Sequence, residues 1–161
     1  MGLHATEAIA FAEGTGVVIK TLLGRARPRK DPEHPYDFKL GRGWLNDEYS
    51  SLPSGHATAA FATAAALSTE LARIYPHESW IVRPLLYGGA GLVGLSRLYN
   101  NDHWASDVVL GAAIGSFAGW KVVRFNHTHP RNRLDRLFLS GNLMPTGDGG
   151  VHISWSLAPG F

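Results

Sequence analysis

Cysteine is absent from all 161 residues, and the chain carries little net charge. The absence of cysteine excludes disulfide bonds and thiol catalysis, and it fits an oxidising or a reducing compartment equally well. The formal charge is +2, and basic residues gather in two short segments, 25–30 and 131–136, rather than in one long stripe. We therefore do not expect nucleic acid as a partner.

Long apolar runs are also missing. The longest uncharged stretches near the predicted helices, 57–69, 84–96 and 108–120, have 13 residues each, whereas a helix that crosses a bilayer needs about 20. The N-terminal segment lacks the basic start and the unbroken apolar core of a signal peptide. We expect no signal peptide and no clear transmembrane helix, and membrane contact that is peripheral at most.

What the sequence does contain is enough apolar residues, 45%, to bury a core in one domain. The spacing of these residues predicts four helices, over 4–23, 55–75, 80–98 and 103–125. On the last of them Gly111, Gly115 and Gly119 continue a ridge of four-residue spacing, which predicts close packing of a second backbone. The fold is therefore expected to be an all-α bundle.

Two segments interrupt this helical pattern. Residues 31–52 form a long connection rich in Pro, Gly and aromatic residues, which we expect to pack over the mouth of a site. Trp44 and Tyr49 are expected to anchor this loop, with substrate contact as the alternative. Near the C-terminus, apolar and polar residues alternate from 151 to 157, which predicts a short β strand or hairpin.

The most informative stretch runs from Ser96 to Asp107. Asn101 or Asp102 is a good N-cap, so we expect a helix to begin here with His103 in its first turn. Asp107 then lies one turn later on the same face. A carboxylate so placed can hold one ring nitrogen of histidine and leave the other unprotonated, as a nucleophile or a general base requires. Taken alone, such a pair is more often structural than catalytic.

Three short motifs stand in a fixed order around this pair. They are Lys20 with Arg27-Pro28, then Pro53-Ser54-Gly55-His56, and finally Ser96-Arg97 with His103 and Asp107. Together they resemble the signature of the type 2 phosphatidic acid phosphatase superfamily, which includes bacterial acid phosphatases and vanadium haloperoxidases. The matching residues span 20–107, somewhat over half of the chain.

The resemblance implies a helical bundle of the PAP2/acid phosphatase type. Residues 1–130 would form the phosphatase core, and 131–161 a C-terminal strap or hairpin of the same domain. Only about one helix precedes the first motif, so we expect the N-terminal helices of the family core to be missing here. The family also implies a location in the cell envelope or periplasm.

The implied activity is metal-independent hydrolysis of phosphate monoesters or pyrophosphates, on a lipid or a small soluble ester. By resemblance, His103 attacks phosphorus to form a phosphohistidine, Asp107 orients it, and His56 acts as general acid and base. The residues that the resemblance assigns to phosphate binding are Lys20, Arg27, Ser54, Gly55 and Arg97.

Elementary chemistry supports several of these roles. Ser54 as an N-cap would leave the first backbone N–H groups of the following helix free to bind an anion. A Ser-capped helix with an incidental histidine is the alternative. Arg25, Arg29 and Lys30 are expected to form a solvated basic helix end.

Other functions stay open. A vanadium haloperoxidase would hold vanadate in the same pocket, and a phosphate-binding module would keep the fold without turnover. We expect no cofactor, with vanadate as an inhibitor or, in a haloperoxidase, as the cofactor. His127 and His129 lack an evident third ligand, so no metal site is expected. The sequence gives no indication of the oligomeric state.

Overall fold

The computed structural model of the chain describes residues 2–129, 141–145 and 151–155. The chain forms two compact units, Met1–Arg124 and Phe125–Phe161. The described helices and strands are α1 (Gly2–Leu23), α2 (Arg42–Leu45), the 3₁₀ helix η1 (Asp47–Tyr49), α3 (Gly55–Ile74), α4 (Ser79–Tyr99), α5 (Ala105–Thr128), β1 (Gly141–Pro145) and β2 (Val151–Trp155). The prediction of a mostly helical fold is confirmed. The assignment of 131–161 to the same domain stays a prediction.

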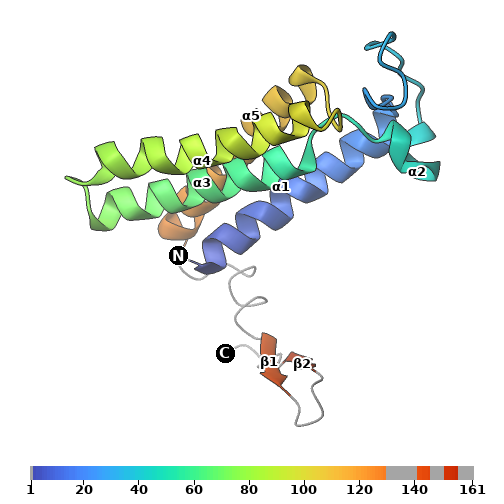
Figure 1. Cartoon of the computed structure of the whole chain (residues 1–161). Helices are drawn as coiled ribbons and strands as arrows, with labels where there is room; N and C mark the ends of the chain where they lie inside the picture. The colour runs from blue at the N-terminus through green and yellow to red at the C-terminus, as the bar shows by residue number, and fades with distance from the viewer. Residues whose placement is uncertain (1, 130–140, 146–150, 156–161) are drawn as a thin grey trace. The chain divides into compact units, whose positions relative to one another are not determined.

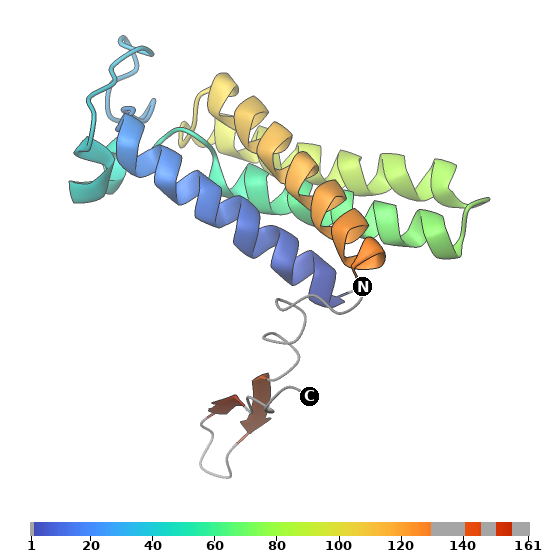
Figure 2. The same ribbon diagram turned by 180° about the vertical axis from the view of Figure 1, so that it is seen from behind.

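Helix α3 is the central element of the first unit. Helices α1 and α4 run along it on either side (Figure 1), and α5 crosses the opposite face (Figure 2). The core between α1, α3 and α5 is built almost wholly from alanine, in two clusters that contain Ala5, Ala8, Ala66 and Val123, and Ala12, Ala62 and Ala118. Such small side chains let helix axes approach to about 8 Å.

The glycine ridge on α5 packs against α3, as its spacing predicted. A Cβ atom added to Gly111 would lie 2.6 Å from the backbone oxygen of Ser54, and one added to Gly115 would lie 2.2 Å from that of Thr58. No side chain fits in such a space, so the glycines fix how closely the two backbones meet. The start of α5 is thereby held against the start of α3.

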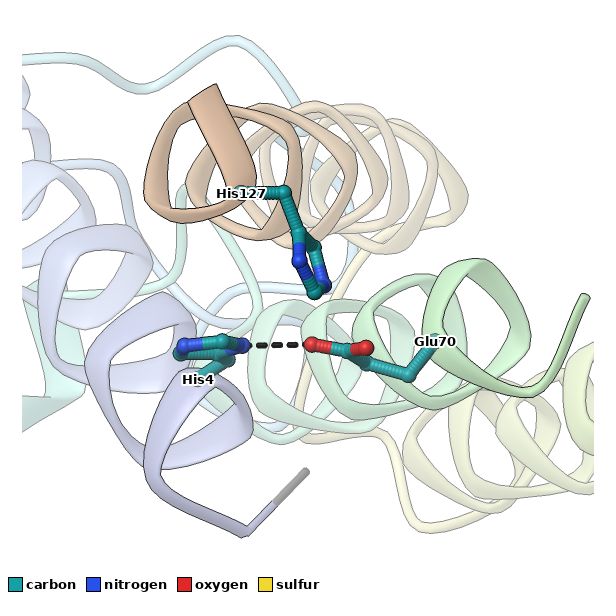
Figure 3. A group of neighbouring side chains, drawn as sticks. All are labelled: His4, Glu70 and His127. Atoms are coloured by element: carbon teal, nitrogen blue, oxygen red, sulfur yellow. Dashed lines mark hydrogen bonds and ion pairs between the residues drawn. The ribbon is translucent and has the colours of Figure 1, made fainter. Parts of the chain in front are cut away.

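The far ends of α1 and α3 are tied by a polar pair. His4 lies near the N-terminus of α1 and hydrogen bonds to the carboxylate of Glu70 near the end of α3 (Figure 3). Glu70 is 4% exposed. Because a buried carboxylate is stable only with polar partners, this pair helps to hold the two helices in antiparallel register.

The end of α1 agrees with the prediction, whereas the start of α5 does not. Helix α1 ends at Leu23, because Gly24 adopts a φ of +55° and turns the chain; Arg27 therefore lies beyond the helix. Helix α5 begins at Ala105, so His103 precedes it instead of lying in its first turn. The cap is made by Asp107, whose carboxylate accepts a 2.9 Å hydrogen bond from the backbone N–H of Trp104.

In the second unit, β1 and β2 pair as an antiparallel hairpin. Leu143 lies opposite Ile153 in the register. Strand β2 coincides with most of the alternating segment 151–157; its last two residues, and residues 131–140 of the expected strap, lie outside the described residues.

The expectation that no segment is long enough to cross a membrane needs correction. Among the described helices, α5 alone is long and apolar enough to span a bilayer, by length and composition only. The uncharged stretch 108–120 ends at Lys121, but a helix that spans a membrane can contain one or two charged residues. Apolar side chains are also exposed on α4, where Leu85, Leu92 and Leu95 are each at least 60% exposed.

Candidate active site

A pocket of about 600 Å³ opens at the N-terminal end of α3. Six of the residues predicted for the site line this pocket: Lys20, Arg27, Gly55, His56, Arg97 and His103. They come from α1, the segment after it, α3, the end of α4 and the loop before α5. Ser54 and Asp107 are fully buried; Ser54 directly precedes Gly55 of the lining, and Asp107 follows His103 by four residues. The fold thus brings the three sequence motifs together.

His103 is 4% exposed and is oriented by the backbone of the preceding loop. Its Nδ1–H donates a 2.7 Å hydrogen bond to the carbonyl oxygen of Ser51. The predicted partner, the carboxylate of Asp107, lies 3.9 Å from Nδ1, which is too long for a hydrogen bond. Because a carbonyl can only accept, this contact fixes the proton on Nδ1 and leaves Nε2 with its lone pair.

Asp107 instead anchors a buried network behind His103. Its carboxylate accepts a 2.5 Å hydrogen bond from the hydroxyl of Ser51 and pairs with the guanidinium of Arg25. Arg25 is 5% exposed, so the expectation of a solvated helix end is wrong for this residue. Arg25 also donates a 2.9 Å hydrogen bond to the carbonyl of Pro35 in the long loop. Asp107 therefore positions Ser51, and through its carbonyl His103.

The environment keeps the His103 imidazole neutral. Burial first, and then the positive charge of Arg27, lower its pKa to about 4, against the opposing effect of the hydrogen bond to Ser51. At neutral pH the ring is therefore unprotonated on Nε2. A neutral imidazole is the form that can act as a nucleophile.

Two arginines reach the pocket from different segments. Arg27 hydrogen bonds through Nη2 to both carboxylate oxygens of Asp47, at 3.0 and 3.1 Å. Arg97 lies 3.4 Å from a carboxylate oxygen of Asp102. These acidic partners hold each guanidinium in place, and neither arginine is fully buried. Planar, permanently charged guanidinium groups suit the oxygens of a phosphate.

Lys20 adds a further cation, from α1, to the arginines that line the pocket. Burial lowers its pKa, and the nearby charge of Arg27 does so too, whereas Glu13 acts in the opposite direction. Four cationic side chains line the pocket together with three carboxylates, and the surplus of positive charge favours an anionic ligand. The residues that would hold an oxyanion such as vanadate are the same as those that would hold phosphate.

The N-terminus of α3 contributes neutral groups to the same pocket. Ser54 occupies the N-cap position as predicted, but its side chain makes no capping hydrogen bond. Its hydroxyl oxygen is buried and has no hydrogen-bond partner within the described residues. Gly55 leaves room for the Lys20 ammonium, which would lie 3.0 Å from an added Cβ. His56 follows in the first turn and is exposed.

Several residues of the pocket were not predicted from the sequence. Glu13, Arg29, Asp47, Asp102 and Ala59 also line it. Asp47 lies in the long loop, which therefore does border the site. The i,i+7 spacing of Glu13 and Lys20 on one helix could have indicated that they share a face.

Of the loop aromatics, Tyr49 anchors and Trp44 does not. The guanidinium of Arg42 lies 3.8 Å from the centre of the Tyr49 ring, a cation–π contact that holds the loop. Trp44 is 77% exposed, so the expectation that it anchors the loop is wrong. Neither ring lines the pocket.

Comparison with known proteins agrees with this geometry. A family model described as PAP2 superfamily matches residues 2–131. A lipid A 1-phosphatase of Porphyromonas gingivalis is 43% identical over 70 residues, which cover 44% of this chain and 15% of the relative. Lipid A 1-phosphatases of Rhizobium johnstonii and Rhizobium etli are 28% and 29% identical, over 73% and 74% of this chain and 44% and 47% of the relatives.

The chain thus spans less than half the length of these curated relatives. No solved structure matches it at a significant level. The family match nevertheless covers most of the chain and contains all three motifs that meet at the pocket. The chain therefore belongs to the PAP2 superfamily.

Proposed function

We propose that this chain hydrolyses phosphate esters without a metal ion, through a phosphohistidine on His103. The observation that carries the proposal is the neutral, oriented imidazole of His103 on the wall of a pocket that four cationic side chains line. Attack on a phosphate dianion requires a nucleophile with a free lone pair and positive charge around the equatorial oxygens. Both requirements are met by side chains of this one unit.

The first step forms a bond between Nε2 of His103 and phosphorus while the bond to the ester oxygen breaks. The leaving oxygen takes a proton from His56, which lines the same pocket. Lys20, Arg27 and Arg97 stabilise the charge on the three equatorial oxygens. The free hydroxyl of Ser54 and the N–H of Gly55 add hydrogen bonds at the helix N-terminus.

The second step releases phosphate. Neutral His56 takes a proton from a water molecule as its oxygen attacks phosphorus, and the bond to Nε2 breaks. His103 returns to its neutral form, with its Nδ1–H still bonded to Ser51. Dividing the reaction in this way replaces one difficult displacement by two easier ones.

A lipid phosphate is the proposed substrate class. The matched relatives are named lipid A 1-phosphatases, and the exposed leucines of α4 offer apolar surface near a membrane. A location in the cell envelope and peripheral or deeper membrane contact belong to the same proposal. Vanadate, which resembles the phosphoryl transition state, is expected to inhibit by occupying the pocket.

The proposal is tested by phosphate release, with EDTA present, from nitrophenyl phosphate, phosphatidic acid, prenyl pyrophosphate and a nucleotide. We expect EDTA-resistant turnover that His103→Ala abolishes, and a phosphoryl adduct on His103 detectable by mass spectrometry. His77→Ala is the matched control, because His77 is exposed in the turn after α3. Full turnover by His103→Ala would refute the proposed mechanism. Bromide oxidation by the vanadate-loaded protein would support the haloperoxidase alternative instead.

A further inference from the structure

Glu13 lies in the pocket, yet the proposed chemistry has no role for it. It is on α1, two helical turns before Lys20, and lines the same pocket as His56 and Ala59. Its carboxylate and the Lys20 ammonium both lie close to Gly55, where an added Cβ would lie 3.0 Å from Nζ of Lys20 and 3.3 Å from Oε2 of Glu13. An acidic group beside a phosphate site is unexpected, because it repels the phosphate.

The fold does not explain this carboxylate. Its Oε1 is buried and accepts no hydrogen bond from any described residue. A buried carboxylate oxygen without a partner costs free energy, and such groups are rare in folded proteins. No ion pair within 4.0 Å joins Glu13 to Lys20 in the described part of the chain, although its charge raises the Lys20 pKa against the effect of burial. A polar partner from outside the chain would satisfy the oxygen.

The position of Glu13 indicates what that partner is. The groups that suit phosphate lie at the N-terminus of α3 and on the segments of Arg27 and Arg97. Glu13 approaches Gly55 at the start of α3, and Ala59, one turn farther along this helix, lines the same pocket. His56, the proposed proton donor to the leaving oxygen, follows Gly55 in the chain and lines this pocket too. The organic part of a substrate would therefore pass Glu13, close to the ester oxygen.

We propose that Glu13 is a specificity-determining residue that accepts a hydrogen bond from a hydroxyl or amine next to the ester oxygen of the substrate. The inference rests on the proposed phosphatase function and narrows its substrates to phosphate monoesters of hydroxylated or amino-substituted compounds, such as polyols and sugars. A simple alkyl phosphate would leave the buried oxygen without a partner. Sites built to bind a donor discriminate strongly against analogues that lack it.

The test compares two soluble esters of equal chain length, glycerol 1-phosphate and propyl phosphate. The measured quantity is the ratio of their kcat/KM values, with EDTA present, in the wild type, Glu13→Ala, Glu13→Gln and Glu78→Ala. Glu78 is the matched control, because it is exposed at the start of α4, remote from the pocket lining. Comparing variants cancels the intrinsic difference in reactivity between the two esters.

We expect the wild type to prefer glycerol 1-phosphate and Glu13→Ala to reduce that ratio about tenfold or more, since a hydrogen bond to a charged group has this effect. Glu13→Gln, which keeps the shape and one acceptor oxygen, should reduce the ratio about threefold. If Glu13→Ala does not fold, the ratio measured for Glu13→Gln tests the proposal. Glu78→Ala should keep the wild-type ratio.

Two outcomes would overturn the proposal. An unchanged ratio in both Glu13 variants, or an equal loss on both esters, would show that Glu13 only supports Lys20. In either case the turnover itself would remain, so the phosphatase proposal would stand. Absence of EDTA-resistant turnover by the wild type on both esters and on the four substrates of the panel above would instead refute the proposed function, and with it the role of Glu13.

Discussion

The Nδ1–H of His103 donates a 2.7 Å hydrogen bond to the backbone carbonyl of Ser51. Asp107, one turn along the chain, supports this arrangement from behind by accepting a hydrogen bond from the Ser51 hydroxyl and pairing with buried Arg25. The acceptor that orients the proposed nucleophile is therefore a backbone group, which no side-chain substitution removes. The carboxylate of Asp107 acts on His103 indirectly, through the position of this loop.

We predict that Asp107→Asn strongly lowers the free energy of unfolding, while the protein that stays folded keeps much of its activity. The substitution leaves the Arg25 guanidinium, 5% exposed, without its counter-charge, and breaking a buried pair costs about 3–5 kcal/mol. Denaturant unfolding measures this loss. Activity of the folded fraction should stay well above that of His103→Ala, since the Ser51 carbonyl is still present.

The matched control for that experiment is Asp37→Asn, which removes a more exposed pair with Arg42 at 2.9 Å. Its free energy of unfolding should fall by no more than about 1 kcal/mol. If the two substitutions lowered the free energy of unfolding equally, the buried pair of Arg25 and Asp107 would contribute no more to stability than the more exposed pair.

We predict that His103 makes the fold less stable in mild acid. Its folded pKa of about 4 is below its ordinary value of 6.5, so the unfolded chain binds a proton first as the pH falls. Stability is therefore lost between about pH 6.5 and pH 4, by up to about 3 kcal/mol for the full shift. Unfolding measured across this range should show a steeper loss in the wild type than in His103→Gln.

An independent measurement is NMR titration of the His103 ring. A midpoint near 4 is expected. A midpoint above 6 would contradict the neutral nucleophile.

We predict that His56→Ala slows alkyl phosphates far more than nitrophenyl phosphate. An alkoxide needs a proton as it leaves, whereas nitrophenolate leaves readily without one, and a positioned general acid contributes about 10²–10⁴-fold. The measurement is kcat for both esters, with His77→Ala as the control. Equal losses on the two esters would count against His56 as the general acid.

We predict that Gly55→Ala weakens phosphate binding without unfolding the protein. The added methyl group would lie 3.0 Å from the Lys20 ammonium and 3.3 Å from the Glu13 carboxylate, both ends of flexible side chains that can move away. Loss of one charged hydrogen bond should raise the inhibition constant of inorganic phosphate about tenfold.

The control is Gly88→Ala on α4, where an added Cβ meets nothing within 4 Å. This substitution should leave phosphate inhibition unchanged and stabilise the helix by about 0.5–1 kcal/mol. A Gly55 variant with wild-type inhibition would show that the close approach of Lys20 is not needed for binding.

The sequence by itself determined the helices and most of the pocket. Apolar spacing and the N-cap at Ser54 are local signals, and α1, α3 and α4 begin and end within two residues of the predicted bounds. The glycine ridge of α5 predicted its close packing, because glycines four residues apart lie on one face of a helix and let another backbone approach it. Three short motifs indicated which residues would meet.

Only the tertiary structure decided the partners of those residues. Arg25 looked like one of several solvated basic residues, and it is buried against Asp107 because the loop 31–52 folds back over it. Ser51 orients His103 through a carbonyl, a group that every residue has and that no sequence pattern can single out. Glu13 reaches the pocket only because α1 runs antiparallel to α3 beside Gly55. Local spacing selects helices and motifs, whereas contacts between distant segments depend on how the helices pack.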